Sequence, residues 1–323
     1  MKLGVFTVLF ADLPFEAMLD RVSSLGLDAV ELGTGNYPGN AHCDPDVLLG
    51  DAGKQREFLG AIEERGLTIS ALSCHGNPLH PDESFARASH ETWRKTARLA
   101  VELGVDVVVC FSGCPGDGPT ATRPNWVTCA WPPDYVELLE WQWDERAVPY
   151  WTEEARFARE TGLTKIALEA HPGFLVYNPE TALRLREAAG AEIGVNFDPS
   201  HFVWQGIDPL EAVRVLGRAG AIFHVHAKDV YLDRANISRN GVLDTKHYGR
   251  FDERSWSFRS VGYGQDEKFW RDFLSALRMV GYDGVLSIEH EDGLASVSEG
   301  IEKAITVLRS AVLREAPAEM WWA

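Results

Sequence analysis

KIALEA, residues 165–170, is an apolar run that ends in an acid, and this pattern decides the fold of the 323-residue chain. Three later stretches repeat it with an acid or an imidazole near their ends: IGVNFDPSH (193–201), AIFHVHAKD (221–229) and VLSIEH (285–290). A short apolar run bounded by polar residues predicts a buried β-strand. The sequence therefore places chemically active side chains where several buried strands end.

The same alternation of strand and helix runs along the whole chain. Strands are expected at 3–10, 28–33, 68–76, 105–113, 164–170, 191–198, 221–229 and 283–291. Helices are expected at 14–26, 55–66, 85–104, 145–162, 180–189, 208–219, 265–281 and 295–314. Such alternation favours parallel strands joined by right-handed crossovers.

This pattern predicts an α/β protein with a single (β/α)₈ TIM barrel, in which active sites form at the carboxyl ends of the strands. An open doubly wound sheet would need a glycine-rich loop after the first strand. The chain instead has Phe10-Ala11-Asp12-Leu13-Pro14 there. The barrel is expected to span residues 1–316 and to be followed by a short tail, 317–323.

Two segments are longer than a barrel needs. Residues 114–144, after the fourth strand, contain four tryptophans and five prolines, and residues 230–263 follow the seventh strand. Long insertions of this kind form lids and substrate walls, or else packing flaps and subunit contacts. Aromatic faces also suit sugar stacking. The ending AEMWWA, 318–323, fits burial in an interface or packing on the barrel itself.

Composition narrows the class of function. The net charge of −17 disfavours nucleic acid, and the most basic segment, 228–259, has seven Lys or Arg against five Asp or Glu. No stretch approaches the roughly 20 apolar residues of a membrane span, and the start lacks a signal peptide, so a cytoplasmic protein is expected. Five irregularly spaced cysteines favour reduced thiols. The expected partner is a small molecule.

The strand ends supply one Asp, one His and two Glu, namely Asp198, His226, Glu169 and Glu289. Each alone has an ordinary explanation, such as a helix cap, a core histidine or a surface ion pair. Together they would converge on one barrel mouth. Carboxylates suit hard divalent cations and an imidazole favours transition metals, so the set predicts a site for Mn²⁺, Co²⁺ or Mg²⁺.

The motifs LEAHPG, NFDPSH, HVHAKD and SIEHE resemble those of the xylose-isomerase-like sugar phosphate isomerase/epimerase superfamily. The resemblance covers most of the chain and implies that Glu169, Asp198, His226 and Glu289 are the metal ligands. It implies that His201 contacts substrate and takes part in catalysis. Strand periodicity points both His224 and His226 inward, and the family pattern favours His226, which is nearer the mouth.

The resemblance also implies three substrate-binding residues. These are His75 at the end of the third strand, Lys228 beside an oxyanion, and Arg259 before the VGYG turn. The endonucleases of the same superfamily need further metal ligands, and the fourth strand here ends in Phe111-Ser112-Gly113 without one. The nuclease interpretation is therefore set aside. No late cluster of Lys or Arg is present to hold a phosphate, so an unphosphorylated sugar is expected.

The function implied is that of an enzyme of carbohydrate metabolism, a sugar isomerase or epimerase. It would hold one divalent ion per chain, with Mn²⁺ favoured, and form a metal-bound enediolate of a keto sugar, with Glu169 and Glu289 as acid and base. The alternative is a lyase or dehydratase that eliminates a leaving group from a 3-keto-glycoside, similar to inosose dehydratases or to catalytic subunits of C-glycoside deglycosidases. A homo-oligomer is expected, or a hetero-oligomer with a small β-rich subunit. A third hypothesis is a non-catalytic barrel that only binds a metal-chelated sugar.

Overall fold

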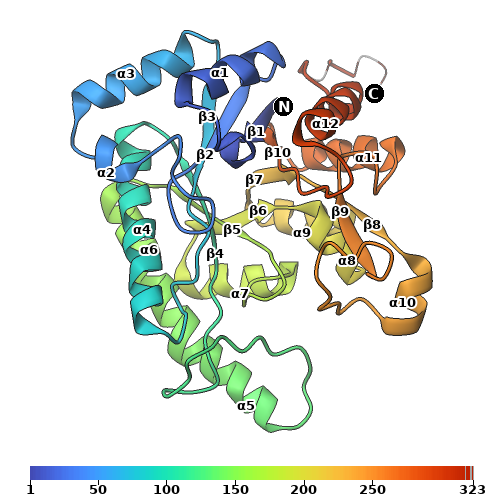
Figure 1. The fold of residues 1–323 in the computed structure, drawn as a ribbon. Coiled ribbons are helices and arrows are strands. Elements are labelled where there is room, and N and C mark those ends of the chain that lie inside the picture. The colour runs from blue at the N-terminus through green and yellow to red at the C-terminus, as the bar shows by residue number, and fades with distance from the viewer. Residues whose placement is uncertain (317, 321, 323) are drawn as a thin grey trace.

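The structure is a computed structural model that describes residues 1–316, 318–320 and 322. Eight parallel strands close into a barrel with helices around it (Figure 1). The barrel strands are β1 (Lys2–Phe6), β2 (Ala29–Gly33), β3 (Thr68–Ser73), β4 (Val107–Phe111), β5 (Lys165–Glu169), β6 (Ile193–Phe197), β7 (Ile222–Ala227) and β10 (Val285–Ile288). β1 pairs with both β2 and β10, which closes the ring and confirms the predicted (β/α)₈ barrel.

The helices return the chain from one strand to the next. They are α1 (Phe15–Ser24), α2 (Pro45–Leu48), α3 (Ala52–Glu63), α4 (Glu83–Glu102), α6 (Val148–Thr161), α7 (Pro179–Ala189), α8 (Pro199–Gln205), α9 (Pro209–Arg218), α11 (Glu267–Met279) and α12 (Val297–Ala311). Several end in a left-handed glycine, such as Gly104 at φ +70° and Gly162 at φ +94°. The apolar residue after each glycine donates its backbone N–H back into the last helical turn, which starts the next strand at a defined point.

The first strand is shorter than predicted. The sequence predicts a strand over 3–10, but β1 ends at Phe6 and Thr7–Phe10 forms a turn of 3₁₀ helix. The hydroxyl of Thr7 donates a 3.0 Å hydrogen bond to the carbonyl oxygen of Glu31, so the chain leaves the sheet at this residue. The run TVLF is apolar because it covers the barrel rim, with Thr7 and Phe10 buried, and not because it extends the strand.

The insertion after β4 is more helical than predicted. α5 (Asp134–Trp141) passes through a π-helical turn (Gln142–Ala147) directly into α6, whereas the sequence predicts that the helix begins at 145. Figure 1 shows α5 projecting well away from the barrel. The indole of Trp143 and the amide of Gln142 are buried, and the Gln142 amide donates to the carbonyl oxygens of Gly116 and Asn125. These bonds tie the irregular part of the insertion to the helix.

The insertion after β7 forms a small separate sheet. β8 (Asp229–Leu232) follows β7 almost at once and pairs antiparallel with β9 (Trp256–Arg259), and α10 (Arg234–Asn240) lies between them. The buried carboxylate of Asp229 accepts backbone N–H groups from Val230, Gly262, Gly264 and Gln265 at 2.7–3.2 Å. This single side chain therefore joins the start of the hairpin to the segment that follows its second strand.

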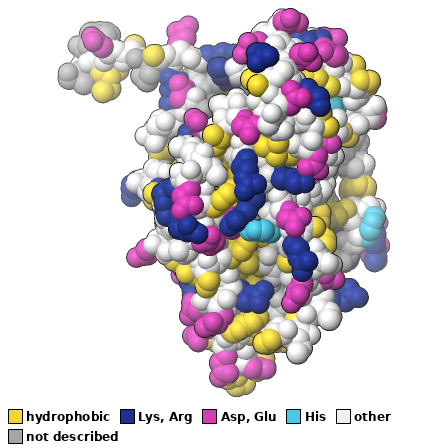
Figure 2. All heavy atoms as spheres, turned by 90° about the vertical axis from the view of Figure 1, so that its left-hand side faces the viewer, with side chains coloured by type: hydrophobic (Ala, Val, Ile, Leu, Met, Phe, Trp, Pro, Cys, Tyr) yellow, Lys and Arg dark blue, Asp and Glu magenta, His cyan; other side chains and the backbone are white. Residues whose placement is uncertain are grey.

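The surface mixes charges of both signs. In Figure 2, basic and acidic side chains alternate over one whole face of the molecule. Some surface charges are paired between helices, as where Arg21 of α1 meets Glu302 of α12 at 3.1 Å. No described helix is both long and apolar enough to cross a membrane. All five cysteines are free, as predicted: Cys43, Cys74, Cys110, Cys114 and Cys129.

Of the two tail tryptophans, Trp321 lies outside the described residues. Trp322 is described, and it is 66% exposed.

Candidate active site

Four predicted side chains meet at the carboxyl end of the barrel. Glu169 is the last residue of β5, His226 lies near the end of β7, and Glu289 follows β10. Asp198 follows β6 and caps α8, where its Oδ1 accepts the backbone N–H of Ser200 at 2.9 Å. One ligand atom from each of the four lies within 4.8 Å of the others. The convergence expected from the strand ends is therefore present.

The atoms at the centre of this cluster suit a divalent cation. The Oδ2 atom of Asp198 and the Nδ1 atom of His226 are buried and make no well-formed hydrogen bond among the described residues, although charged groups lie near both. The Nδ1 atom of His226 lies 2.9 Å from Glu289 and 3.3 Å from Glu169. Three carboxylates held so closely in a buried place need positive charge among them. Oxygen donors with one imidazole are a fitting set for Mn²⁺.

The imidazole of His226 is oriented by Glu31, which sequence reasoning missed. Both carboxylate oxygens of Glu31 lie 3.0 Å from the Nε2 atom of His226, and they also accept the hydroxyls of Ser73 and Ser287 at 2.5 and 2.6 Å. Burial alone raises the pKa of Glu31, but His226 and His224 lower it to about 2. An ionised acceptor at Nε2 places the proton there and leaves Nδ1 free toward the cluster.

The two histidines of the HVH motif have different surroundings. His224 lies deeper, with Nδ1 3.0 Å from Asn196 and Nε2 3.8 Å from Glu31. Burial lowers the pKa of His224 to about 4. For His226, burial also lowers the pKa, but Glu31 and Glu289 raise it well above its usual value. A proton and a cation would therefore compete for the Nδ1 atom of His226.

Glu169 is held by imidazoles on two sides. His75 lies 3.0 Å from its Oε2, and His201 lies 3.2 Å from its Oε1 and 3.3 Å from Asp198. Burial raises the pKa of Glu169, but hydrogen bonds from His201, His226 and His75 outweigh it and hold that pKa well below the usual value. Both predicted histidines are thus within hydrogen-bonding distance of the same carboxylate.

Lys228 is almost fully buried beside three carboxylates. Its ammonium lies 2.9 Å from Glu291, 3.3 Å from Glu289 and 3.6 Å from Asp198, and 4.3 Å above the ring of Phe258. Burial lowers the pKa of this lysine, but the surrounding carboxylates raise it well above normal. For Glu289 burial raises the pKa, while Lys228 and His226 lower it to about 2. The site therefore keeps a fixed cation beside an ionised glutamate.

Arg259 lies apart from this group. Its guanidinium is 3.1 Å from the carboxylate of Asp292, which also accepts the backbone N–H and the hydroxyl of Ser260. The arginine is not among the residues that line the cavities of the mouth. The structure thus gives it a partner within the chain, and its contact with substrate stays a prediction.

A cavity of about 390 Å³ opens above the cluster. Its walls include Glu169, Glu289, Lys228 and His75 on the polar side and Phe111 on the apolar side. Pockets of roughly 300–1,000 Å³ hold small-molecule ligands. The cavity is large enough for a sugar and places it directly against the two glutamates.

His171 was also not singled out from the sequence, although it lies two residues after Glu169 in LEAHPG. Its Nδ1 lies 2.6 Å from the carbonyl oxygen of Pro172, and its ring centroid is 4.1 Å from that of His201. Burial lowers the pKa of His171 to about 3, so the ring is neutral. The signal in the sequence was the position of His171, only two residues after the metal-ligand candidate Glu169.

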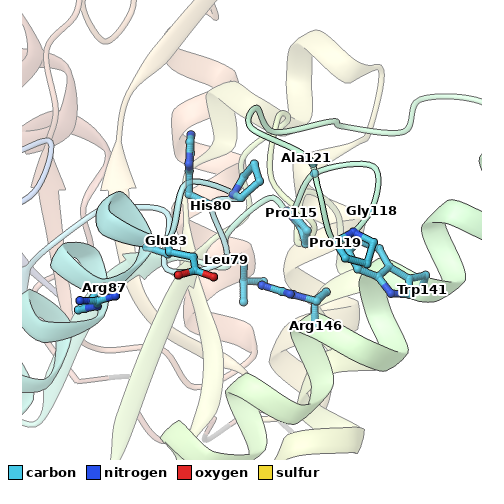
Figure 3. A pocket seen from close by; sticks show the side chains of 13 residues that line it. Leu79, His80, Glu83, Arg87, Pro115, Gly118, Pro119, Ala121, Trp141 and Arg146 are labelled. Atoms are coloured by element: carbon cyan, nitrogen blue, oxygen red, sulfur yellow. The ribbon is translucent and has the colours of Figure 1, made fainter.

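Another cavity of about 320 Å³ lies away from the mouth, between the start of α4 and the insertion after β4 (Figure 3). Glu83 and Arg146 face it from opposite sides, and Trp141 lies against Pro119 at its edge. None of the predicted site residues lines this cavity.

Comparison with known proteins agrees with this architecture. Residues 19–311 match the family model described as xylose isomerase-like TIM barrel, and the chain belongs to that family. It is 42% identical over 314 residues to the uncharacterized protein YfiH of Bacillus subtilis, which covers 97% of this chain and 99% of that protein. It is 25% identical over 300 residues to the uncharacterized protein MJ1311 of Methanocaldococcus jannaschii, which covers 90% of this chain and 84% of that protein.

Solved structures of low identity share the fold. The probable 3-DHS dehydratase AsbF of Bacillus anthracis has a TM-score of 0.68 at 16% identity and covers 96% of this chain and 99% of its own. The 3-keto-D-glucoside 4-epimerase YcjR of E. coli has a TM-score of 0.64 at 15% identity, with the same coverage. The fold of this chain is therefore one that sugar epimerases and dehydratases also have.

Proposed function

We propose that this protein is a divalent-metal-dependent sugar isomerase or epimerase that moves a proton at a carbon beside a carbonyl group. The observation that carries the proposal is the cluster of Glu169, Asp198, His226 and Glu289, in which two buried atoms make no well-formed hydrogen bond. The epimerase names of several structural neighbours agree with it. The substrate would be an unphosphorylated keto sugar.

Mn²⁺ fits the donor set ahead of Co²⁺ or Mg²⁺, with one ion per chain, because three carboxylates are combined with one imidazole. When bound, such an ion would supply Lewis-acid polarisation of the substrate carbonyl, which acidifies the neighbouring C–H. The four ligands above would hold it, with His226 using its Nδ1 atom.

The protein's own carboxylates would transfer the proton. Glu169 and Glu289 both line the cavity, and both are ionised because their pKa values are lowered. One would accept the proton from carbon and later release it to solvent, while the other would take a proton from solvent and return it to carbon, which gives an epimer or an isomer. His201 would keep Glu169 oriented, and the ammonium of Lys228 would stabilise negative charge that develops on the substrate oxygen. His75 is placed to contact a substrate hydroxyl.

The alternative is a lyase or dehydratase that uses the same first step. After proton removal, a group at the β-position would leave, so that the product loses mass. The observation that favours this alternative is the extra space beside the catalytic cavity, which has room for a leaving group. The two chemistries separate by mass balance, because an isomerase conserves the formula of its substrate.

The test is incubation of Mn²⁺-loaded protein in D₂O with free ketoses and with 3-keto-glucosides. Deuterium uptake without loss of mass supports the isomerase or epimerase. Release of water or of an aglycone supports the lyase. Metal binding without exchange on any of these sugars would leave a non-catalytic binding barrel as the better description.

Glu169→Gln and Glu289→Gln should each lower kcat by at least about 10³-fold, because each removes one of the two proton carriers. Glu154→Gln is the matched control, since Glu154 is a buried glutamate of α6 outside the site. Turnover is measured as deuterium exchange with protein of verified metal content. Full activity in both site variants would refute the two-carboxylate mechanism.

A further inference from the structure

A second cavity, of about 360 Å³, adjoins the catalytic one. We call it the tryptophan cavity, because Trp126, Trp204 and Trp256 form its walls together with Tyr248 and Phe258. His171 lines both cavities, and His201, which contacts Glu169, lines the tryptophan cavity at the same end. A molecule in the catalytic cavity can therefore extend past these two imidazoles into an aromatic space.

Three distant parts of the chain build this cavity. Trp126 comes from the insertion after β4, and Trp256 and Phe258 come from β9 in the insertion after β7. Trp204 lies on α8, three residues after His201 and six after Asp198. The two long insertions thus meet at this cavity. α8, which is capped by the metal-ligand candidate Asp198, supplies a third part of its wall.

The walls of the cavity are flat and rigid. The indoles of Trp204 and Trp256 are stacked, with centroids 4.6 Å apart and planes 9° apart. Buried Arg254 contacts two of the wall residues. Its guanidinium lies 4.6 Å from the centre of the Trp256 ring and 4.3 Å from that of Tyr248. Its Nε also donates to the carbonyl oxygen of Trp256 at 3.0 Å. An aromatic surface held in this way suits a planar ligand, because little conformational entropy is lost when it binds.

The indole N–H groups do not define the ligand of this cavity. The Nε1 atoms of Trp126 and Trp204 are buried, and neither has a hydrogen-bond partner among the residues described. Atoms with so little accessible surface do not face the open cavity, so a ligand there would meet the ring surfaces of the walls.

We propose that the tryptophan cavity binds a planar aromatic substituent on the sugar whose carbonyl carbon lies in the catalytic cavity. This substrate class rests on the proposed function, since it assumes that a sugar occupies the catalytic cavity. It goes beyond that function because free ketoses would fill only one of the two spaces. The insertions after β4 and β7 then act together to select the substituent.

The test compares the binding of phenyl 3-keto-β-D-glucoside and methyl 3-keto-β-D-glucoside to Mn²⁺-loaded protein by isothermal titration calorimetry. The wild-type protein should bind the phenyl glucoside at least about tenfold more tightly. Trp204→Ala and Trp256→Ala should each reduce that ratio to less than about threefold. Trp204→Phe keeps a ring on α8 and should retain most of the preference. Trp131→Ala is the matched control. Trp131 is a 74% exposed tryptophan of the insertion after β4, and it does not line the cavity.

Equal affinity for the two glucosides would overturn the proposal, as would no measurable binding of either. A preference that survives in both alanine variants would also overturn it. Deuterium exchange with free ketoses, measured on the same preparation, separates this proposal from the proposed function. Exchange without an aryl preference overturns the substituent site alone, whereas an aryl preference without exchange overturns the proposed reaction and leaves the cavity as a binding site.

Discussion

Glu31 is a buried acid whose four acceptor contacts all lie below the catalytic cavity. It holds the Nε2 atom of His226, and a residue that orients a ligating imidazole contributes to metal affinity without touching the metal. The side chain belongs to β2, where the pairing with β3 shifts register between Val30 and Glu31. Its place in the barrel follows from that irregularity.

Glu31→Gln should weaken Mn²⁺ binding by roughly 10–100-fold, because a neutral amide is a poorer acceptor for the imidazole N–H and leaves its orientation less defined. The dissociation constant is measured by competition with a metal-binding dye. Glu154→Gln removes a buried charge elsewhere and should leave metal affinity unchanged. An unaltered affinity in Glu31→Gln would show that His226 is oriented by other contacts.

Most residues of the metal-ligand cluster could be predicted from the sequence, and the reason is chemical. Glu169 and Glu289 end apolar strands, where an unpaired charge is costly, so their presence signals a partner. Glu31 has a similar signal in DAVELG, but it lies one layer deeper and contacts side chains of β3, β7 and β10. That role depends on strand register, which the sequence does not show.

The hairpin of β8 and β9 is the element that carries two walls of the tryptophan cavity. Its attachment depends on Asp229, whose carboxylate accepts four backbone N–H groups and also lies 3.4 Å from the indole nitrogen of Trp270. Gly264 packs so closely that an added Cβ would lie 2.3 Å from the carbonyl of Val230. A side chain at position 264 would therefore collide with the backbone of β8.

Asp229→Asn should lower the free energy of unfolding by about 1–3 kcal/mol, because the amide nitrogen faces donors and leaves at least one of them unsatisfied. Urea denaturation followed by tryptophan fluorescence measures the change. Asp233→Asn is the matched control within the same insertion, since Asp233 caps α10 and asparagine caps a helix about equally well. Equal stability of both variants would mean that the hairpin is held by other contacts.

At the level of elements, the sequence predicted the barrel strands but not their ends. β1 stops at Phe6 because Thr7 turns the chain, and this turn leaves no mark in an apolar run. α5 was missed because the prolines and tryptophans around it suggest a loop, whereas the helix is continuous with α6 through a π-turn.

The whole molecule should be stabilised by the cation. A ligand that binds only the folded state adds about 2.7 kcal/mol at a concentration of 100 times its Kd. Removing divalent ions with EDTA should therefore lower Tm by several degrees, and Mn²⁺ should restore it. In Asp198→Asn, a cluster variant, the shift should be much smaller. If Tm fell by the same amount in this variant as in the wild-type protein, the stabilising ion would bind at another site.

The reactivity of the five cysteine thiols can be used to test whether the barrel is folded. Burial raises the pKa of Cys43, Cys74 and Cys114 to about 12, and that of Cys110 well above its usual value, whereas Cys129 is exposed. Because the thiolate is the reactive form, iodoacetamide at pH 8 should label only Cys129 in the folded protein and all five in urea. Mass spectrometry counts the labels. Cys129→Ser should remove the native label, and rapid labelling of the others would contradict the closed barrel.

For the molecule as a whole, strand and helix alternation was enough to predict the barrel, because parallel strands with right-handed crossovers leave few topologies. The meeting of the two insertions over one cavity could not be predicted, since residues 114–144 and 230–263 have no periodic pattern that specifies a path. The homo-oligomer and the β-rich partner subunit stay predictions.

The helix α8 sets a limit on how this protein can change during evolution. Asp198, His201 and Trp204 are spaced by three residues, so one short helix directs a metal-ligand candidate, a histidine that contacts Glu169 and a cavity wall. A single inserted or deleted residue would rotate the later positions by about 100° and misplace two of the three at once. The segment from 198 to 204 is thus expected to keep its length during evolution.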